Sequence, residues 1–379
     1  MKKVLFILAS AELGGAEKQA IILASEIIKQ NIFLVEFVLF DDFRGAASDR
    51  LSEKNIKTYF CKPISSKYLL ITWFRIFKYW QLLLKISPDY LLPYTYYPNI
   101  YSCFLSKYIR ENKCIWNQRD EGIGFNQSFI TRKALSRADY FIANSKNARE
   151  FLLHLNIPSE KIAIIQNGFI NTTVKTPRSQ IRRSLNIEEE TLICCMISNI
   201  TPYKDHDTLL KAWKIVCDTL NDRSLVLLLV GRLGSTYESL VSLAAKLSIT
   251  SQILFMGPTD DINQILNAVD LSVLSSRSEG LPNVLIETMF AKVPFTGTNI
   301  PGIVNVLGND YSQYLSEPGN CQDMAEKIIW FIRNPIETNE LAQRNFNILA
   351  DKYSSERLLK DTVMLLETNE PGFKEEPKK

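Results

Sequence analysis

Two glutamates eight positions apart frame the part of this 379-residue chain where chemistry is easiest to place. Glu279 stands directly before a Gly-Leu-Pro-Asn turn, and Glu287 lies in the apolar run that follows it. Carboxylates in these positions accept hydrogen bonds from hydroxyl groups. The turn between them suits the start of a helix, whose free backbone N–H groups bind anions such as phosphate. A ligand with phosphate groups between two hydroxylated parts would fit this segment.

The flanking residues predict the elements that would hold these groups. Residues 270–275 form a short apolar and β-branched run, which is typical of a buried strand. Gly280 then breaks the chain, and Pro282 suits a helix start because its φ is already fixed. Residues 283–291 carry apolar side chains at helical spacing. We therefore expect a strand, a tight turn and a helix whose N-terminus faces the ligand.

Composition excludes several classes of protein. Apolar residues make up 46% of the chain and charged residues 22%, which predicts a globular protein of more than one domain. The net charge of +3 is too small to indicate nucleic-acid binding. Seven scattered cysteines without a CxxC pair or a Cys/His cluster argue against a structural zinc site. Unpaired thiols favour a cytoplasmic protein, and no uncharged run approaches the roughly 20 residues of a membrane span.

The first residues predict a nucleotide-type βα unit. An apolar strand over residues 4–9 is followed by Gly14 and Gly15 and then by a helix over residues 17–29. Glycine allows a backbone to approach a ligand closely because it has no side chain. An ordinary turn between a strand and a helix explains the two glycines equally well. The turn is not GxGxxG, so the glycine fingerprint of a dehydrogenase is absent.

The string EGLPNVLIE from Glu279 to Glu287 resembles the E-x7-E signature of retaining family 4 glycosyltransferases of the group 1 type. The resemblance extends over nearly the whole chain, through the ADYFIANS string that begins at Ala138 and the Asn167-Gly168 turn. It implies an α/β protein of the GT-B fold, with two Rossmann-like, doubly wound parallel-sheet domains facing a cleft. The expected parts are residues 1–175, residues 176–350, a terminal helix over 354–367 that returns to the first domain, and a disordered tail over 368–379.

The resemblance also assigns roles to residues. It places Glu279 on the donor sugar, Glu287 on the ribose hydroxyls and Lys204 on the charge of the leaving diphosphate. Asn199 occupies a position where relatives carry an arginine, and Arg119 stands where many carry a histidine. A salt-bridged rim position explains Arg119 equally well. The remaining expected donor contacts are Gly14, Gly15, Gly257, Gly280, Leu281, Pro282, Asn283 and Val284.

The expected reaction moves a sugar from a nucleotide diphosphate sugar to an acceptor hydroxyl. By resemblance, the anomeric configuration is retained, the acceptor is a polysaccharide or lipid-linked glycan, and neither a metal nor another cofactor takes part. Three alternatives stay open, namely a non-catalytic GT-B partner subunit, a GT-B sugar-nucleotide epimerase and a dehydrogenase. The epimerase would need its own acid and base groups, which a chain with two histidines supplies poorly.

The segment from Lys67 to Lys85 predicts an aromatic, basic amphipathic helix. Such a helix can lie in a membrane interface, here the inner face of the cytoplasmic membrane. It can equally pack on the first sheet with its basic side chains at the rim. The face in question carries Leu70, Trp73, Phe74, Phe77, Trp80, Gln81 and Leu84.

Overall fold

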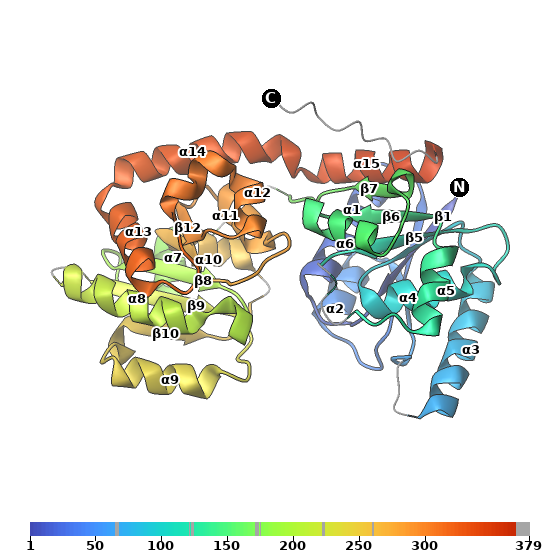
Figure 1. The fold of residues 1–379 in the computed structure, drawn as a ribbon, viewed down its shortest axis with the longest axis horizontal. Helices are drawn as coiled ribbons and strands as arrows, with labels where there is room; N and C mark the ends of the chain where they lie inside the picture. Colours follow the sequence, from blue (N-terminus) through green and yellow to red (C-terminus); the bar gives the residue numbers. More distant parts are fainter. Residues whose placement is uncertain are drawn as a thin grey trace. The chain divides into compact units, whose positions relative to one another are not determined.

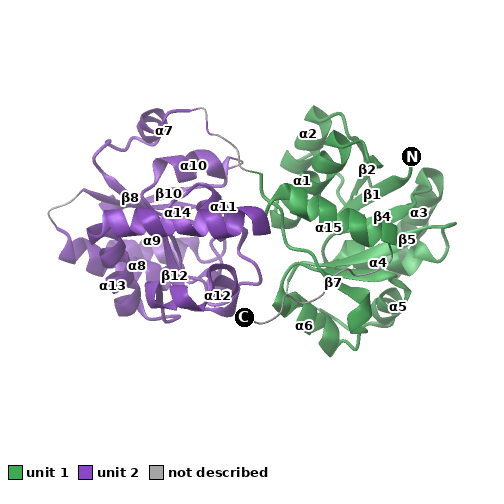
Figure 2. Cartoon of the chain, turned by 90° about the horizontal axis from the view of Figure 1, so that it is seen from above, with its two compact units in different colours: residues 1–170, 353–379 green, residues 171–352 purple. Residues whose placement is uncertain are grey.

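The computed structural model divides the chain into two compact units. Unit 1 comprises Met1–Ile170 and Tyr353–Lys379, and unit 2 comprises Asn171–Lys352 (Figure 2). From the sequence, the first part was expected to end at residue 175 and the second at residue 350. The structure describes residues 1–64, 68–120, 122, 125–170, 174, 176–221, 224–259 and 261–368. The expected disordered tail lies outside the described residues from position 369 onwards.

Unit 1 is built on a seven-stranded parallel sheet in the order β3-β2-β1-β4-β5-β6-β7. The first strand, β1, lies inside the sheet, and β2 and β3 follow on one side of it. The chain then crosses to the other side of β1, where β4 pairs with it. The carboxyl ends of β1 and β4 therefore form a switch point, where open α/β sheets bind ligands. The strands are β1 (Lys3–Leu8), β2 (Leu34–Leu39), β3 (Lys57–Phe60), β4 (Tyr90–Pro93), β5 (Lys113–Gln118), β6 (Tyr140–Ala143) and β7 (Ile162–Ile164).

Helices cover both faces of this sheet because side chains alternate along each strand. Val4, Phe6 and Leu8 of β1 pack on one face with α1, α2 and α15. Leu5 and Ile7 pack on the other face with α3, α4, α5 and α6. The helices are α1 (Gly15–Lys29), α2 (Ala46–Glu53), α3 (Leu69–Ile86), α4 (Tyr96–Ser106), α5 (Phe129–Arg137), α6 (Lys146–His154) and α15 (Ser355–Thr368) (Figure 1).

The C-terminal helix α15 belongs to unit 1 by hydrogen bonding as well as by packing. The Phe169 amide donates to the Tyr353 carbonyl at 2.7 Å, and the Ser355 amide donates to the Phe169 carbonyl at 3.2 Å. Gly168 lies so close to α15 that a Cβ there would stand 2.9 Å from the side chain of Leu358. Helix α15 is therefore part of unit 1.

Unit 2 repeats this plan with a six-stranded parallel sheet in the order β10-β9-β8-β11-β12-β13. Its switch point lies between β8 and β11. The strands are β8 (Leu192–Ile197), β9 (Leu225–Val230), β10 (Ile253–Met256), β11 (Leu271–Leu274), β12 (Phe295–Thr298) and β13 (Leu315–Ser316). The helices are α7 (Arg178–Ser184), α8 (His206–Thr219), α9 (Tyr237–Lys246), α10 (Ile262–Ala268), α11 (Asn283–Phe290), α12 (Pro301–Leu307), α13 (Cys321–Arg333) and α14 (Pro335–Lys352).

Two polar side chains are buried where helices meet the sheets. Helix α4 begins at Tyr96, shortly after β4, and its Asn99 is buried. The Asn99 side chain donates to the Asn117 carbonyl and accepts from the Asn117 amide, which ties α4 to β5. Helix α7 likewise carries a buried Arg182.

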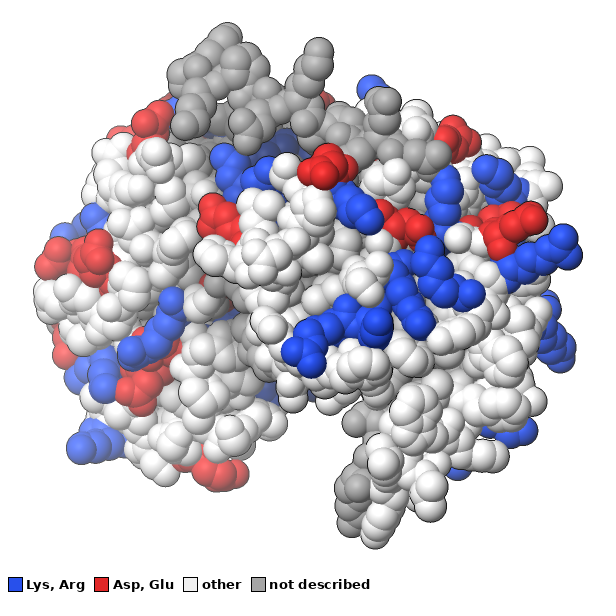
Figure 3. Space-filling model, turned by 45° about the vertical axis from the view of Figure 1, so that its right-hand side comes forward, with Lys and Arg blue, Asp and Glu red and all other residues white. Residues whose placement is uncertain are grey.

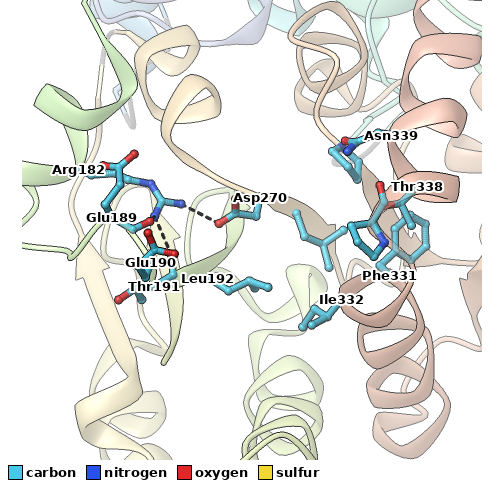
Figure 4. Close-up of a pocket in the computed structure, with 13 residues that line it drawn as sticks. Arg182, Glu189, Glu190, Thr191, Leu192, Asp270, Phe331, Ile332, Thr338 and Asn339 are labelled. Carbon is cyan, nitrogen blue, oxygen red and sulfur yellow. Dashed lines mark hydrogen bonds and ion pairs between the residues drawn. The ribbon is translucent and has the colours of Figure 1, made fainter. Parts of the chain in front are cut away.

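Arg182 joins α7 to the amino-terminal edge of the unit 2 sheet. Its guanidinium donates to Asp270 and to the carbonyls of Ala268, Glu189 and Thr191. Asp270 also accepts from Arg178 and from the Ile193 amide. This network lines a cavity of about 360 Å³ at the start of β8 and β11, opposite the carboxyl edge where the sequence predicts the donor site (Figure 4). We assign the network a structural role.

We predict that Arg182→Ala lowers the free energy of unfolding by roughly 3 kcal/mol, because it leaves several backbone carbonyls without their donor and removes one of the two arginines that pair with Asp270. Arg183→Ala is the matched control, since Arg183 is exposed on the same helix. Chemical denaturation of both variants measures the difference. Equal stability of the two variants would contradict the assigned role.

Candidate functional site

The helix that follows β11 begins where the sequence predicts. Helix α11 runs from Asn283 to Phe290, and Pro282 precedes its first residue, as expected for a segment of 283–291. The turn between β11 and α11 leaves the carboxyl edge of the sheet at the switch point. The first backbone N–H groups of any α-helix have no acceptor within the helix, and the helix dipole makes this end positive. This position favours an anionic ligand.

The structure brings together two predicted site residues from different parts of unit 2. The Lys204 ammonium group, after β8, forms an ion pair with the carboxylate of Glu279, after β11. The same carboxylate oxygen accepts a hydrogen bond from the Ser276 hydroxyl at 2.6 Å. The side chains of Lys204 and Glu279 are only 14% and 11% exposed. A cation and a carboxylate are thus held in fixed positions beside the N-terminus of α11.

Backbone and side-chain contacts hold the two loops against each other. The Ser275 hydroxyl donates to the Lys204 carbonyl at 2.9 Å, and the Arg277 amide donates to the Tyr203 carbonyl at 2.8 Å. The Arg277 side chain also pairs with the buried Asp205 at 2.9 Å. Ser275, Ser276 and Arg277 were not among the predicted site residues, although they lie directly before Glu279. Their partners are distant in sequence and could not be read from it.

Glycines around Glu279 serve two different purposes. A Cβ on Gly302 would stand 2.1 Å from the Glu279 carbonyl oxygen, so α12 needs glycine there to hold the backbone of Glu279. Gly280 and Gly257, both predicted donor contacts, have no atom within 4 Å of a Cβ position. Neither has a positive φ. The fold therefore leaves open space beside these two backbones, which a ligand could occupy.

Two further predicted donor residues lie close to the same edge. Glu287 is buried in α11. Asn199 follows β8 and accepts a hydrogen bond from the Arg232 amide at 3.1 Å, which joins the ends of β8 and β9. Arg232 has an exposed side chain and was not among the predicted site residues, although it directly follows Gly231, the first residue after β9. Asn199 is uncharged, but the loop that it contacts carries the cationic side chain of Arg232.

Arg119 occupies the carboxyl edge of the unit 1 sheet among neutral partners. Its guanidinium donates to Asn167 at 2.7 Å and to Asn117 at 3.3 Å, and it stacks over the Tyr94 ring with 4.5 Å to the centroid. Burial lowers the pKa of the Arg119 guanidinium, although guanidinium groups keep their charge in proteins. No ion pair joins Arg119 to a carboxylate within the described parts of the chain, so the salt-bridged interpretation finds no support there.

Three neighbouring strand ends of unit 1 each carry a buried polar atom that lacks a hydrogen-bond partner among the described residues. These atoms are Thr95 Oγ1 after β4, Arg119 Nε after β5 and Asn144 Oδ1 after β6. Thr95 also has a φ of 70°, which is rare for a β-branched residue. Buried polar groups normally find a partner, so this edge is suited to a hydroxylated ligand.

The glycine turn after β1 lies at the same edge of unit 1. Gly14 precedes α1, which begins at Gly15, and its φ of −109° is open to any residue. A Cβ on Gly14 would meet only the flexible end of the Glu17 side chain, at 2.6 Å. The predicted contacts of Gly14 and Gly15 with the diphosphate stay predictions.

Two family descriptions match adjoining parts of the chain. "Glycosyltransferase Family 4" matches residues 13–170, and "Glycosyl transferases group 1" matches residues 177–347. The chain belongs to glycosyltransferase family 4. The resemblance inferred from the EGLPNVLIE string is thereby confirmed.

Curated relatives and solved structures agree with this family. N-acetyl-alpha-D-glucosaminyl L-malate synthase of Bacillus anthracis is 26% identical over 232 residues, which are 61% of this chain and 60% of that protein. The O-antigen biosynthesis glycosyltransferase WclY of Escherichia coli is 23% identical over 221 residues, 58% of this chain and 59% of its own. The matched region therefore spans about three fifths of each relative.

A crystal structure of Anabaena HepE in complex with UDP and glucose superposes with a TM-score of 0.84 at 21% identity. The match covers 97% of this chain and 100% of that one. This likeness confirms the predicted GT-B fold with two Rossmann-like parallel-sheet domains. The residue roles at the site stay predictions.

His206 makes the stability of unit 2 depend on pH. Burial, and next the positive charge of Lys204, lower the pKa of the His206 imidazole from 6.5 to about 4. The ring is neutral at pH 7, with its Nε2 atom 3.3 Å from the Ser198 hydroxyl. Protonation therefore favours the unfolded state, in which the pKa is ordinary. The stability is complete above pH 6.5 and falls as the pH drops towards 4.

We predict that the free energy of unfolding decreases by roughly 3 kcal/mol from this group between pH 6.5 and pH 4. The pH-dependent decrease in the free energy of unfolding should be absent in His206→Gln. It should remain in His154→Gln, because His154 is exposed. Urea denaturation at a series of pH values compares the three proteins. Parallel pH profiles for the wild type and His206→Gln would refute the buried, neutral histidine.

Proposed function

We propose that this protein transfers a glycosyl group from a nucleoside diphosphate sugar to an acceptor hydroxyl, with retention of configuration and without a metal ion. The observation that carries the proposal is the Lys204–Glu279 pair beside the N-terminus of α11. Family membership supports the reaction class. No group of three or more metal-ligating side chains gathers within the described residues.

The donor would lie along the carboxyl edge of the unit 2 sheet. In this proposal the diphosphate binds the backbone at the start of α11, Glu279 accepts from a sugar hydroxyl, and Glu287 accepts from the ribose. Open space beside Gly280 and Gly257 suits this placement. Anabaena HepE was crystallised with UDP and glucose, so a uridine nucleotide is the first base to test.

The chemical difficulty is the negative charge that develops on the departing diphosphate. Lys204 is preorganised to meet this charge because Glu279 and the neighbouring loops fix its position. Arg232 would contribute a second cation from the end of β9. A preorganised donor of this kind is typically worth roughly 3 kcal/mol of transition-state stabilisation. The diphosphate oxygen released by the sugar would accept the proton of the attacking hydroxyl.

The acceptor would bind the carboxyl edge of unit 1. Thr95, Arg119 and Asn144 offer it two hydrogen-bond donors and two kinds of oxygen acceptor. A hydroxyl-rich glycan matches these groups. The curated names of relatives include O-antigen biosynthesis, and we extend the proposal to a polysaccharide or lipid-linked glycan as acceptor. A lipid-linked acceptor would bring the protein to the cytoplasmic face of a membrane.

Donor binding can be measured by thermal unfolding with UDP-, GDP-, ADP- and CMP-sugars in the presence of EDTA. A donor at about 100 times its Kd stabilises the folded state by about 2.7 kcal/mol. We predict that the sugars of one nucleotide raise the unfolding temperature, and that the increase is the same in EDTA as in added Mg²⁺. A shift that needs Mg²⁺ would overturn the metal-free proposal, and no shift with any nucleotide would overturn the donor site.

Two substitutions separate binding from turnover. Glu287→Ala should abolish the donor-induced thermal shift, because it removes the proposed ribose contact. Lys204→Ala should lower kcat by about 10²- to 10³-fold, because it removes charge stabilisation from the leaving group. Lys211→Ala is the matched control, since Lys211 is half exposed on the neighbouring helix α8. Wild-type kcat and donor binding in both test variants would refute the assigned roles.

A further inference from the structure

Helix α3 of unit 1 has two apolar faces, and only one of them packs on the protein. Ile76, Tyr79, Leu83 and Ile86 are buried against the sheet. The aromatic face predicted from the sequence is a different one, and the structure leaves most of it in solvent. Helix α3 therefore packs on the sheet, as one of the two alternatives proposed, but it does so through a different face.

The exposed face is large for a surface helix. Leu70 is 85% exposed, Phe74 61%, Phe77 47% and Trp73 46%. These side chains follow one another at helical spacing and form one continuous stripe, which Leu69 extends at 72% exposure. In Figure 3 the end of α3 projects from unit 1 and is almost free of charged side chains. Contiguous apolar surface of this kind marks an interaction site.

The charges on α3 have one sign. The helix contains Arg75, Lys78 and Lys85 and no aspartate or glutamate. The Lys78 ammonium lies 5.7 Å from the centroid of the Phe74 ring, so cation and aromatic stripe are neighbours. The Trp80 indole donates to the Tyr108 carbonyl at 3.2 Å, which joins α3 to a loop where Lys107 and Tyr108 are both exposed.

We propose that this face, which we call the α3 surface, docks onto an anionic lipid bilayer. Its apolar side chains would enter the boundary between head groups and acyl chains, and its basic side chains would contact lipid phosphates. Aromatic and basic residues together are typical of helices that lie in a membrane interface. No helix within the described ranges is long and apolar enough to cross a membrane, so docking would be peripheral.

The positive charges on α3 favour a bilayer over a second copy of this chain as the partner of the α3 surface. A symmetric dimer places the same patch on both sides of the interface. Two α3 surfaces would then bring the cations of Arg75, Lys78 and Lys85 together with no carboxylate on either helix to compensate them. Anionic head groups supply the missing negative charge. The structure therefore favours the bilayer.

The test is flotation of the purified full chain with two kinds of large unilamellar vesicle. One contains phosphatidylcholine alone, and the other contains equal parts of phosphatidylcholine and phosphatidylglycerol. We expect binding to the anionic vesicles that weakens with salt. Leu70→Glu and Phe74→Glu should each lower the affinity by roughly tenfold, because each removes a membrane-buried apolar side chain. Ile336→Glu is the matched control, since Ile336 is 73% exposed in unit 2.

A second pair of variants tests the charges separately. Lys78→Gln and Lys85→Gln should each lower the affinity for anionic vesicles by about fivefold, since each removes one cation near the membrane surface. Neither should affect binding to phosphatidylcholine alone. Equal binding by all variants would overturn the proposal. So would light scattering that shows a dimer which Phe74→Glu dissociates, together with no vesicle binding by the wild type.

Only the link between docking and catalysis rests on the proposed function. Flotation needs no donor, and the thermal shift with nucleotide sugars needs no vesicle. We expect Phe74→Glu to keep the donor-induced shift and Glu287→Ala to keep vesicle binding. Membrane docking and donor binding are therefore tested by separate measurements.

Discussion

The ion pair between Lys204 and Glu279 is the interaction on which the candidate donor site depends. It connects the loops after β8 and β11, the two strands on either side of the switch point in unit 2. Both side chains are largely buried, and a buried charge is stable only when a partner compensates it. The pair therefore fixes the cationic loop relative to the start of α11. A ligand that binds one of these elements meets the other in a set position.

The same two strands are held at their opposite ends by a second charged network. Asp270 receives hydrogen bonds from Arg178, Arg182 and the amide at the start of β8. Every nitrogen of the Arg182 guanidinium donates to an acceptor within unit 2. The chemistry of this network makes it a structural junction, whereas the carboxyl edge carries the groups that suit a donor.

Unit 1 uses the same sheet geometry with different chemistry. Its carboxyl edge holds one arginine among asparagine side chains, and it leaves buried polar atoms without partners. Such an edge can bind hydroxyl groups of many arrangements, which suits the acceptor side of a transferase. The α3 surface lies on one face of the same unit. Acceptor binding and the proposed membrane contact would then belong to one unit, and donor binding to the other.

The sequence by itself determined the family, the strand–turn–helix elements and the segment that forms α11. These features depend on local periodicity, glycine and proline positions and one specific string, all of which are visible along the chain. Only the tertiary structure paired Lys204 with Glu279, placed Arg232 beside Asn199 and buried Arg182, because these contacts join residues up to 88 positions apart. It also decided which face of α3 is exposed. Both faces are apolar, so periodicity could not distinguish the one that packs on the sheet from the one that does not.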